Sequence, residues 1–531
     1  MATRNFWGWG NVEGAFNEAQ KNNLKALMKM QMGVTPEPLT PPTLESLRMP
    51  EPAFSAPESL SGCLDDSRFE RANHTYGKAF RDVVRGLEGD YQAAPDYVAF
   101  PQTEQALTDI MDWAADNNAA VIPYGGGSSV TGGTEARYDS RRNGTISVDM
   151  RHFNRLLSLD KTSRTAEFQG GIYGPALEEA LRPHEYSLRH FPQSFEFSTL
   201  GGWIATRSGG HYATLHTHIE DFVESVRMVT PQGVMESRRL PGSGAGPSVD
   251  RLIAGSEGIF GFITSAWMRV QDRPRFRAKM SVRFDDFYAG AHAARLLSQS
   301  GLNPSNCRLI DAQEALNNGI GNGKKHLLLV GFESADHALA PWLQRAEEIC
   351  RDCGGVVRHD KRESPKQGAG ASDDWRNQFI QAPYMRDALA TLGMVAETFE
   401  TAITWDKFQE FHEGILEAVR SAAKEVCGQC MVTCRFTHLY PDGPAPYYTV
   451  IAPGKAGSQL QQWDEIKAAA SEAIIRLGGT ITHHHSVGRD HRPWYEQQRP
   501  DLFAESLSAV KDRLDPAGIL NPGVLLRDRA R

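Results

Sequence analysis

The stretch PYGGGSSVTGG, residues 123–133, decides the fold because it joins clustered glycines to serine and threonine hydroxyls. It follows the apolar residues 119–122, so we expect a strand that runs into a glycine loop. Glycines let backbone N–H groups approach an anion without a Cβ in the way, and hydroxyls add donors. No Gly-Lys-Ser/Thr follows, and the spacing is not GxGxxG, which excludes a P-loop and a Rossmann fingerprint. Alone, the stretch fits either a pyrophosphate loop or a plain glycine-rich turn.

Two further segments of the same character follow along the chain. Residues 193–211 read QSFEFSTLGGWIATRSGGH, and residues 255–264 read GSEGIFGFIT. Small and hydroxylated residues alternate there with apolar ones, which suits a planar ring system with a polar edge and a phosphate tail. Three such segments within one region are more specific than any single one.

The surrounding pattern alternates strands and helices from about residue 90. Residues 103–118, TEQALTDIMDWAADNN, predict an amphipathic helix, and 174–183, GPALEEALRP, another with proline in its first turn. Residues 276–475 predict a further set of strands and helices, which we interpret as a cap domain. The expected division is 1–89 (helical and extended), 90–275 (cofactor domain), 276–480 (cap) and 481–531 (C-terminal segment).

Composition excludes several classes of function. The 531 residues are too many for one core, and a net charge of −8 without a Lys/Arg block argues against a nucleic-acid partner. No apolar run reaches the length of a membrane span, and the start lacks the layout of a secretion signal. The seven cysteines, with CxxC pairs at 350/353 and 427/430, fit reduced thiols better than a zinc site. We therefore expect a cytoplasmic protein.

The order IPYGGGSSVTGG, FSTLGGWIATRSGG, GSEGIFGFIT resembles the FAD-binding domain of the vanillyl-alcohol-oxidase superfamily. Within it, the chain is most similar to the alkylglycerone-phosphate synthase family, nearly end to end. Further stretches carry the similarity: the opening FWGWG, residues 219–233, IEDFVESVRMVTPQG, and the histidine run THHHSVG. The resemblance implies an α+β fold, with a two-subdomain FAD-binding domain, an α/β cap domain, and helical segments at both ends.

The resemblance also implies FAD contacts. The glycine loop has neither the His nor the Cys that tethers the flavin in many relatives, which fits noncovalent FAD. The implied contact residues are Pro123, Tyr124, Gly125, Gly126, Gly127, Ser128, Ser129, Gln193, Ser194, Phe195, Glu196, Phe197, Ser198, Thr199, Thr206, Arg207, Ser208, Gly209, Glu257, Gly258, Ile259, Phe260, Gly261, Phe262 and Ile263.

The run His483, His484 and His485 is the next candidate for chemistry. If the run is extended, His483 and His485 point to one side and His484 to the other. Imidazoles exchange protons near neutral pH and tune one another. A metal site shared by His483 and His485, or a surface strand, stays open as an alternative. We favour acid–base or substrate-phosphate work by the three histidines and predict no metal.

Three further residues carry over from the resemblance. Tyr447 matches the family's catalytic tyrosine, although Tyr448 leaves the register uncertain by one and a buried strand aromatic is the plain alternative. Arg386 matches the substrate-binding arginine, since a guanidinium suits a phosphate, but the adjacent Asp387 offers a structural ion pair instead. Arg308 matches an arginine that the family needs for activity, in a supporting role.

The activity implied is exchange of the acyl group of an acyl-dihydroxyacetone phosphate for a long-chain alcohol, with oxidised flavin as a covalent scaffold and no net redox. An FAD-linked dehydrogenase or oxidase of a 2-hydroxy acid or alcohol is the alternative, although its relatives carry Glu-His-Gly where residues 484–486 are His-His-Ser. A flavoprotein without catalysis is a third. We expect a homodimer with a lipid substrate and peripheral membrane contact. Residues 14–32 predict a terminal helix packed on the body or, less favoured, a membrane-surface helix.

Overall fold

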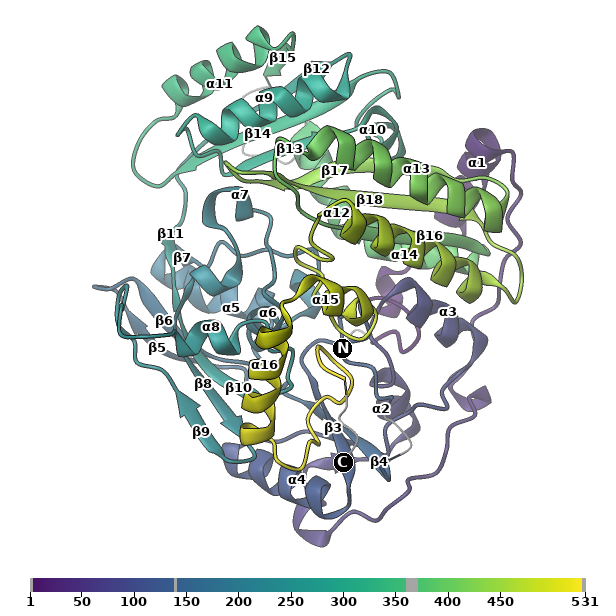
Figure 1. The fold of residues 1–531 in the computed structure, drawn as a ribbon, viewed down its shortest axis with the longest axis vertical. Coiled ribbons are helices and arrows are strands. Elements are labelled where there is room, and N and C mark those ends of the chain that lie inside the picture. The colour runs from purple at the N-terminus through teal and green to yellow at the C-terminus, as the bar shows by residue number, and fades with distance from the viewer. Residues whose placement is uncertain (1–2, 138–140, 360–370, 528–531) are drawn as a thin grey trace.

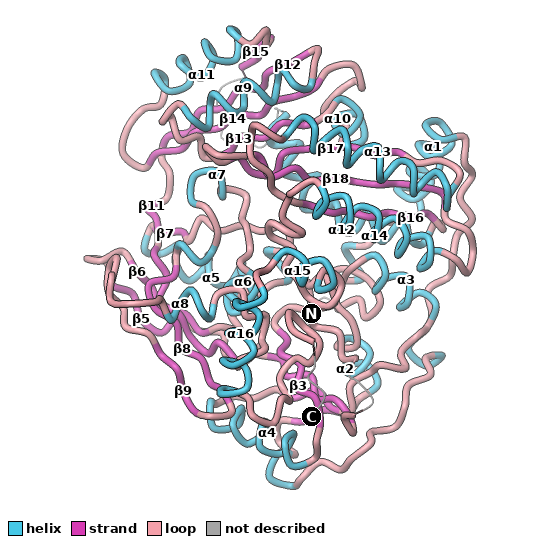
Figure 2. Tube along the Cα trace, in the orientation of Figure 1, coloured by secondary structure: helices cyan, strands magenta, loops and turns pink. Residues whose placement is uncertain are grey.

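The computed structural model describes residues 3–137, 141–359 and 371–527. Two halves are stacked along the long axis of the molecule, and loops and short helices fill the space between them (Figures 1 and 2). One half holds two main sheets and the other a single seven-stranded sheet. This is the predicted α+β architecture.

The first sheet of the lower half carries the glycine loop. Its order is β1 (Leu64–Asp65), β2 (Tyr97–Ala99), β4 (Gly144–Asp149), β3 (Ala119–Tyr124), and β2, β4 and β3 run parallel. Parallel strands are covered on both faces, so β3 is a continuous apolar run. Helix α4 (Glu104–Asp116) starts at the cap Thr103 and packs Leu107 and Ile110 into this core. The loop after β3 therefore starts from a rigid strand end.

The second sheet is antiparallel, in the order β5 (Leu156–Asp160), β6 (Thr165–Gln169), β10 (Phe262–Arg269), β8 (Val223–Thr230), β9 (Gly233–Glu236). Apolar residues of α5 (Gly174–Leu181), α6 (Leu200–Thr206) and α8 (Val249–Ile253) pack on it. The short strands β7 (Tyr186–Ser187) and β11 (Gln271–Asp272) pair separately, where the chain leaves for the other half.

The cap sheet is antiparallel throughout, in the order β15 (Val356–His359), β12 (Phe276–Phe284), β14 (His326–Ser334), β13 (Asn306–Ile310), β17 (Met431–Leu439), β18 (Pro444–Pro453), β16 (Met394–Glu400). Its core includes residues from α9 (Phe287–Gln299), α11 (Ala340–Asp352), α12 (Ala371–Thr391), α13 (Phe408–Cys427) and α14 (Gln459–Arg476). Short helices α7 (Ala213–His216) and α10 (Ala312–Asn317) contact β13, β14 and β17. One face of β16, β17 and β18 is left to face the other half.

The chain ends tie the two halves together. Helix α1 (Glu18–Met32) buries Leu24 and Met28 in the cap core, which is the packed terminal helix favoured from sequence. Helices α2 (Arg68–Asn73) and α3 (Phe80–Glu88) follow, and α3 joins the same core. Helices α15 (Arg492–Gln498) and α16 (Asp501–Leu514) descend along the lower half (Figure 1).

Two further findings bear on the sequence analysis. In the part of the chain that the structure describes, no helix has the length and apolar character needed to cross a membrane. The seven cysteines are all free thiols, and Cys307, Cys350 and Cys434 are buried.

Candidate active site

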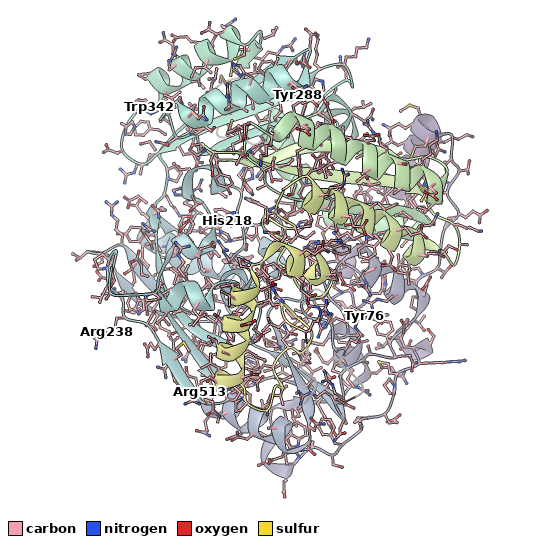
Figure 3. All side chains as sticks on the ribbon, viewed as in Figure 1. Tyr76, His218, Arg238, Tyr288, Trp342 and Arg513 are labelled. Carbon is pink, nitrogen blue, oxygen red and sulfur yellow. The ribbon has the colours of Figure 1, made fainter. Side chains whose placement is uncertain are left out.

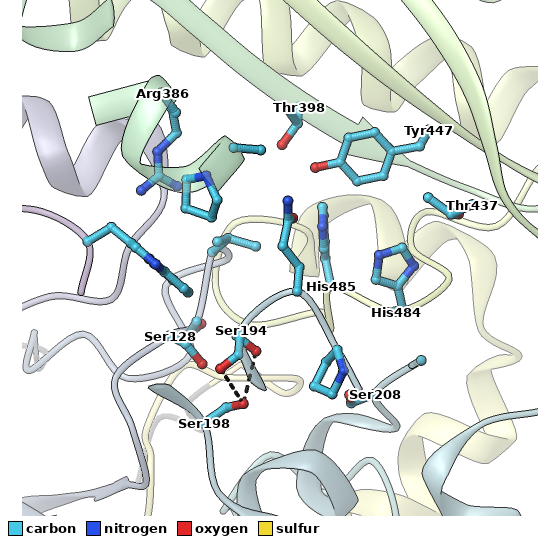
Figure 4. A pocket seen from close by; sticks show the side chains of 18 of the residues that line it. Ser128, Ser194, Ser198, Ser208, Arg386, Thr398, Thr437, Tyr447, His484 and His485 are labelled. Atoms are coloured by element: carbon cyan, nitrogen blue, oxygen red, sulfur yellow. Dashed lines mark hydrogen bonds between the residues drawn. The ribbon is translucent and has the colours of Figure 1, made fainter. Parts of the chain in front are cut away.

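A cavity lies between the two halves of the molecule (Figure 4). Its floor is built from the glycine loop, residues 192–199 and residues 206–211. Its roof is one face of the cap sheet. Side chains alternate along a strand, so every second residue of a strand faces the cavity. The roof residues are Ala396 and Thr398 of β16, Thr433, Arg435 and Thr437 of β17, and Tyr447, Thr449 and Ile451 of β18. The cavity thus joins a hydroxyl-rich floor to a more mixed roof.

The floor depends on close contact between two backbone segments. A Cβ on Gly126 would lie 1.9 Å from the carbonyl oxygen of Phe197, and one on Gly125 would lie 2.4 Å from Oγ1 of Thr199. Tyr173 donates to the carbonyl of Gly125 from the same side. Glycine is therefore required at both positions, and the two segments predicted to hold FAD lie against each other.

Substitution of Gly126 with alanine is expected to weaken FAD binding about tenfold to a hundredfold, since overpacking of this kind costs about 1–3 kcal/mol and forces the loop away from residue 197. Titration of flavin-free protein with FAD measures the change. Gly62, where a Cβ meets nothing within 4 Å, supplies the control variant Gly62→Ala. Equal FAD affinity in both variants would contradict the role given to the loop.

The cavity brings together about half of the predicted cofactor residues. Those that line it are Gly125, Gly126, Gly127, Ser128, Ser129, Gln193, Ser194, Ser198, Thr199, Thr206, Ser208 and Gly209. The others, all within the described chain, are not part of its lining: Pro123, Tyr124, Phe195, Glu196, Phe197, Arg207, Glu257, Gly258, Ile259, Phe260, Gly261, Phe262 and Ile263. For this second set, direct contact with FAD stays a prediction.

The third glycine segment has a structural task in this arrangement. Glu257 is buried and accepts hydrogen bonds from the backbone N–H groups of Val487 (2.8 Å) and Gly488 (2.7 Å). Ile259 and Phe260 lie in the core of the five-stranded sheet. The segment holds the turn that follows the histidine run rather than lining the cavity itself.

Tyr447, and not Tyr448, faces the cavity (Figure 4). Alternation along β18 sends Tyr448 to the opposite face, where its ring stacks on Phe399 and its hydroxyl lies 3.0 Å from Nδ1 of His412. Cross-strand register places Tyr447 between Glu400 of β16 and Arg435 of β17. The Arg435 guanidinium lies 3.8 Å from the centre of the Tyr447 ring. Burial raises the pKa of Tyr447, and Arg435 acts against that rise.

The histidine run is bent around a buried carboxylate, so the condition under which His483 and His485 would point to one side is not met. The backbone N–H groups of His483, His484 and His485 all donate to Glu400, at 2.8 to 3.1 Å, and Thr482 donates its hydroxyl. Convergence of three consecutive N–H groups on one anion forces the chain to turn. Burial acts to raise the pKa of Glu400, but the imidazoles of His484, His485 and His483 and the Thr482 hydroxyl hold it well below its usual range.

The bend keeps the three rings in contact with one another but gives them different surroundings. His484 and His485 line the cavity, with the His485 ring 5.5 Å from that of Tyr447. His483 turns behind them, where its Nε2 lies 3.2 Å from Nε2 of His218 and 2.9 Å from the Tyr440 hydroxyl. Two of the three predicted catalytic histidines therefore reach the cavity.

The two predicted arginines both line the cavity. Arg386 gives its Nε and Nη2 to Asp387 Oδ1, at 3.1 and 2.8 Å, and Nη1 to the carbonyl of Lys78. The structural ion pair weighed from sequence is thus present, although the guanidinium still borders the space (Figure 4). Arg308 is buried beside His211, and burial lowers its pKa to about 9.

Acid is expected to destabilise the fold below about pH 6.5. Burial lowers the pKa of His484 and His485 to about 4 and that of His190 and His491 to about 3. The unfolded chain binds protons at these positions first, so stability is full above about pH 6.5 and falls as the pH drops toward the folded values. Each such histidine adds a slope of up to about 1.4 kcal/mol per pH unit.

Thermal unfolding followed by circular dichroism at about pH 7.5 and about pH 5.5 checks this, and the Tm should be lower at the acid value. Burial raises the pKa of Glu257 and Asp311 to about 7 and that of Asp490 to about 6, and these three carboxyl groups act in the opposite direction. An unchanged Tm would show that these histidines do not stay neutral in the folded protein.

Comparison with known proteins agrees with this geometry. A family model described as the FAD binding domain matches residues 95–237, and one described as the C-terminal domain of FAD linked oxidases matches residues 273–525. The alkyldihydroxyacetonephosphate synthase of Dictyostelium discoideum is 30% identical over 495 residues, which cover 89% of this chain and 79% of that protein. The chain belongs to the alkyldihydroxyacetonephosphate synthase-like FAD-linked oxidases.

Other members and relatives extend this family assignment. The alkyldihydroxyacetonephosphate synthase of Trypanosoma brucei brucei is 28% identical over 90% of this chain and 82% of its own length. A solved alkyldihydroxyacetonephosphate synthase is 25% identical, with a TM-score of 0.81 over 98% of both chains. The glycolate oxidase subunit GlcD of Bacillus subtilis is 24% identical over 90% of this chain and 96% of that protein. The matched domains indicate FAD as the cofactor of this family member.

The floor fits that cofactor on its own evidence. Seven serine and threonine hydroxyl side chains line it, and Gly125, Gly126 and Gly127 leave no room for a Cβ. Exposed backbone and hydroxyl donors are what a diphosphate and a ribityl chain require. The family assignment and the structure thus agree on an FAD-dependent enzyme.

Sequence reasoning missed several residues of the site. Glu400, Arg435 and His218 lie far apart in the sequence and meet only through sheet register and the bent run. Trp9 lines the cavity from the N-terminal segment, and in the sequence only its place in the stretch FWGWG marks it. Glu400, Arg435 and His218 belong to no motif with a recognisable spacing, so no local signal in the sequence identifies them.

Proposed function

We propose that this FAD enzyme is an ether-lipid synthase, which exchanges the acyl group of an acyl-dihydroxyacetone phosphate for a long-chain alcohol without net redox. The observation that carries the proposal is the placement of Tyr447, Arg386 and the pair His484 and His485 around one cavity. The chain's similarity to three synthases over most of its length supports it. The FAD is proposed to be noncovalent, since no cysteine is among the lining residues and the glycine loop has no histidine.

The reaction breaks one carbon–oxygen bond and forms another. The fatty acid leaves as a carboxylate with its oxygen, and the alcohol oxygen takes its place and gives up a proton. Bound flavin supplies the group that holds the substrate carbon between these steps. Oxidation states of both substrates are unchanged, so no electron donor or acceptor is required.

The residues of this chain would bind the substrate and move protons. Tyr447 is buried with its hydroxyl in the cavity, where its deprotonated form, which Arg435 favours against the effect of burial, would take and return the proton on the carbon beside the ketone. His484 and His485, neutral at pH 7 because burial lowers their pKa to about 4, would accept the alcohol proton. Arg386 would hold the substrate phosphate, in partial exchange for its bond to Asp387.

Incubation of the FAD-loaded protein with acyl-dihydroxyacetone phosphate and a labelled fatty alcohol tests the proposal. Labelled ether product and an equal amount of released fatty acid are expected, with the flavin still oxidised at the end. Absence of labelled ether would reject the synthase. Acid precipitation of the protein should leave the yellow cofactor in solution, whereas a coloured pellet would reject noncovalent binding.

A second candidate is an FAD-linked dehydrogenase of a 2-hydroxy acid, because the chain is similar to a glycolate oxidase subunit over almost all of that protein. The same cavity could place the hydroxy acid between the floor and Arg386. Anaerobic addition of glycolate or D-lactate separates the two functions. Bleaching of the flavin absorbance would favour the dehydrogenase, and an unchanged spectrum the synthase.

A further inference from the structure

The glycine loop carries backbone donors that have no acceptor in the described chain. Gly126 and Gly127 are buried and line the cavity, and their N–H groups form no hydrogen bond with any residue that the structure describes. Buried backbone N–H groups are almost always paired, so two unpaired neighbours call for an acceptor within the cavity. Successive N–H groups in a loop of this kind form an anion site. The loop therefore suits the diphosphate of FAD.

The carbonyl groups of the same loop are held by side chains. Arg4 Nη2 donates to the carbonyl of Gly126 at 3.0 Å, and the Tyr173 hydroxyl donates to that of Gly125 at 3.2 Å. In a trans peptide unit, the C=O of one residue and the N–H of the next point in opposite directions. The two side chains therefore turn the N–H groups of Gly126 and Gly127 away from themselves. Neither Arg4 nor Tyr173 is among the residues that line the cavity, so the donors are left on its side.

Arg4 brings a positive charge to the loop and forms no ion pair with a carboxylate of the described residues. Besides the carbonyl of Gly126, its guanidinium contacts the Phe197 ring, with the guanidinium carbon 4.7 Å from the ring centre. The backbone of Arg4 is fixed, because it pairs with Asn11 in an antiparallel bridge. An arginine that is held in place without an ion pair is suited to a bound phosphate.

Two further cationic side chains lie next to the loop. Lys78 is 3% exposed, its backbone N–H donates to the Ser129 carbonyl at 2.5 Å, and its own carbonyl accepts from Arg386. It lies between α2 and α3, two residues after Tyr76, which Figure 3 shows in the lower half beneath the cap sheet. Ser129 and Arg386 both line the cavity, so Lys78 lies directly behind the cavity wall.

Positive charge is in excess around Lys78. Burial and then Arg4 lower the pKa of Lys78 to about 7, and Arg386 acts in the same direction. Asp387 and Asp82 act against them, but Asp82 is already paired with an arginine of its own helix at 2.6 Å. Cations that are crowded together with too few carboxylates favour the binding of an anion.

We propose that Arg4 is a positioning residue of the FAD site, which holds the Gly126 carbonyl so that the N–H of Gly127 is turned to bind the cofactor diphosphate, and which adds its charge beside that anion. Arg4 acts through the loop, since it does not line the cavity itself. Hydrogen bonds from a charged donor are about twice as strong as neutral ones, so the guanidinium fixes this peptide more firmly than Tyr173 fixes the preceding one. The inference depends on FAD binding and holds for the synthase and the dehydrogenase alike.

Titration of the flavin-free protein with FAD, followed by the change in flavin fluorescence, tests the role of Arg4. Arg4→Met should weaken FAD binding about tenfold to a hundredfold, the factor that a hydrogen bond to a charged group contributes. Arg4→Gln keeps a donor for the carbonyl but has no charge, and it should lose less affinity. Arg48, exposed in the same N-terminal segment, supplies the control Arg48→Met, which should bind FAD as the unaltered protein does.

The salt dependence of FAD binding separates this role from a merely structural one. The affinity of the unaltered protein should fall between about 50 mM and about 500 mM salt, and the fall should be smaller in both Arg4 variants because a charge is missing. Equal FAD affinity, or an equal salt dependence, in Arg4→Met and the unaltered protein would overturn the proposal. Should Arg4→Met fail to fold, as seen in circular dichroism, the same comparison with Arg4→Gln decides.

Discussion

Tyr447→Phe is expected to lower the rate of ether formation about a hundredfold to ten-thousandfold and to leave FAD bound. General acid–base groups contribute a factor of this size, and the substitution removes only the proton-carrying hydroxyl. The ring stays, so its contact with the Arg435 guanidinium, 3.8 Å from the ring centre, is kept. The KM for the acyl substrate should change little, because the loss falls on the chemical step. Initial rates with labelled alcohol, at saturating substrate, measure the effect.

The neighbouring residue supplies a matched control for this prediction. Tyr448→Phe removes a hydroxyl from the same strand, but on the opposite face, where it contacts His412. That variant should lose about 1 kcal/mol of stability, as a typical buried hydrogen bond contributes, and keep its rate. Equal rates in Tyr447→Phe and the unaltered enzyme would remove Tyr447 from the mechanism.

Glu400→Gln is expected to displace the histidine run and to lower activity by a factor of about a hundred or more. The carboxylate is 1% exposed and accepts from the N–H groups of His483, His484 and His485 and from the Thr482 hydroxyl. A glutamine has one acceptor oxygen and turns an N–H₂ toward some of these donors, which leaves buried groups unpaired at a cost of about 1–3 kcal/mol each. We expect the free energy of unfolding to fall by about 2–4 kcal/mol.

A positioning role is separable from a merely structural one for Glu400. If the carboxylate orients His484 and His485, the pH–rate profile of the variant should move along the pH axis, and its maximum rate should also fall. Both changes are expected because the surroundings of the two imidazoles change. Glu410, exposed on α13, provides the control Glu410→Gln, which should match the unaltered enzyme in both respects. Loss of stability in Glu400→Gln with an unchanged profile and rate would limit the residue to structure.

Sequence predicts those parts of the fold that depend on residues close together in the chain. Apolar β3 ending in clustered glycines, the Thr103 cap of α4 and the proline in the first turn of α5 are short-range signals, and each is found in place. The sequence of the third glycine segment resembles a cofactor loop. In the structure, however, its apolar residues pack in the core, and Glu257 accepts a hydrogen bond from the turn at residue 487. Composition cannot distinguish a glycine that faces a ligand from one that faces another backbone.

The active site also depends on contacts that local sequence does not predict. Tyr447 and Arg386 were identified through resemblance, and the structure adds what resemblance does not contain, namely the Asp387 ion pair and the choice between two adjacent tyrosines. The bend of the histidine run follows from Glu400, which lies about 80 residues earlier and meets the run only after the cap sheet has formed. Long-range register, rather than local propensity, decides which rings meet.

The N-terminal segment has a consequence for how the molecule comes apart. Arg4 donates a hydrogen bond to the carbonyl of Gly126. Trp9 borders the cavity and donates its backbone N–H to Asp387. Helix α1 packs in the cap core. A single stretch of chain therefore fastens the cofactor loop to the opposite layer. Cofactor release and melting of the cap should then occur together, as one cooperative transition on a calorimeter trace rather than two successive peaks.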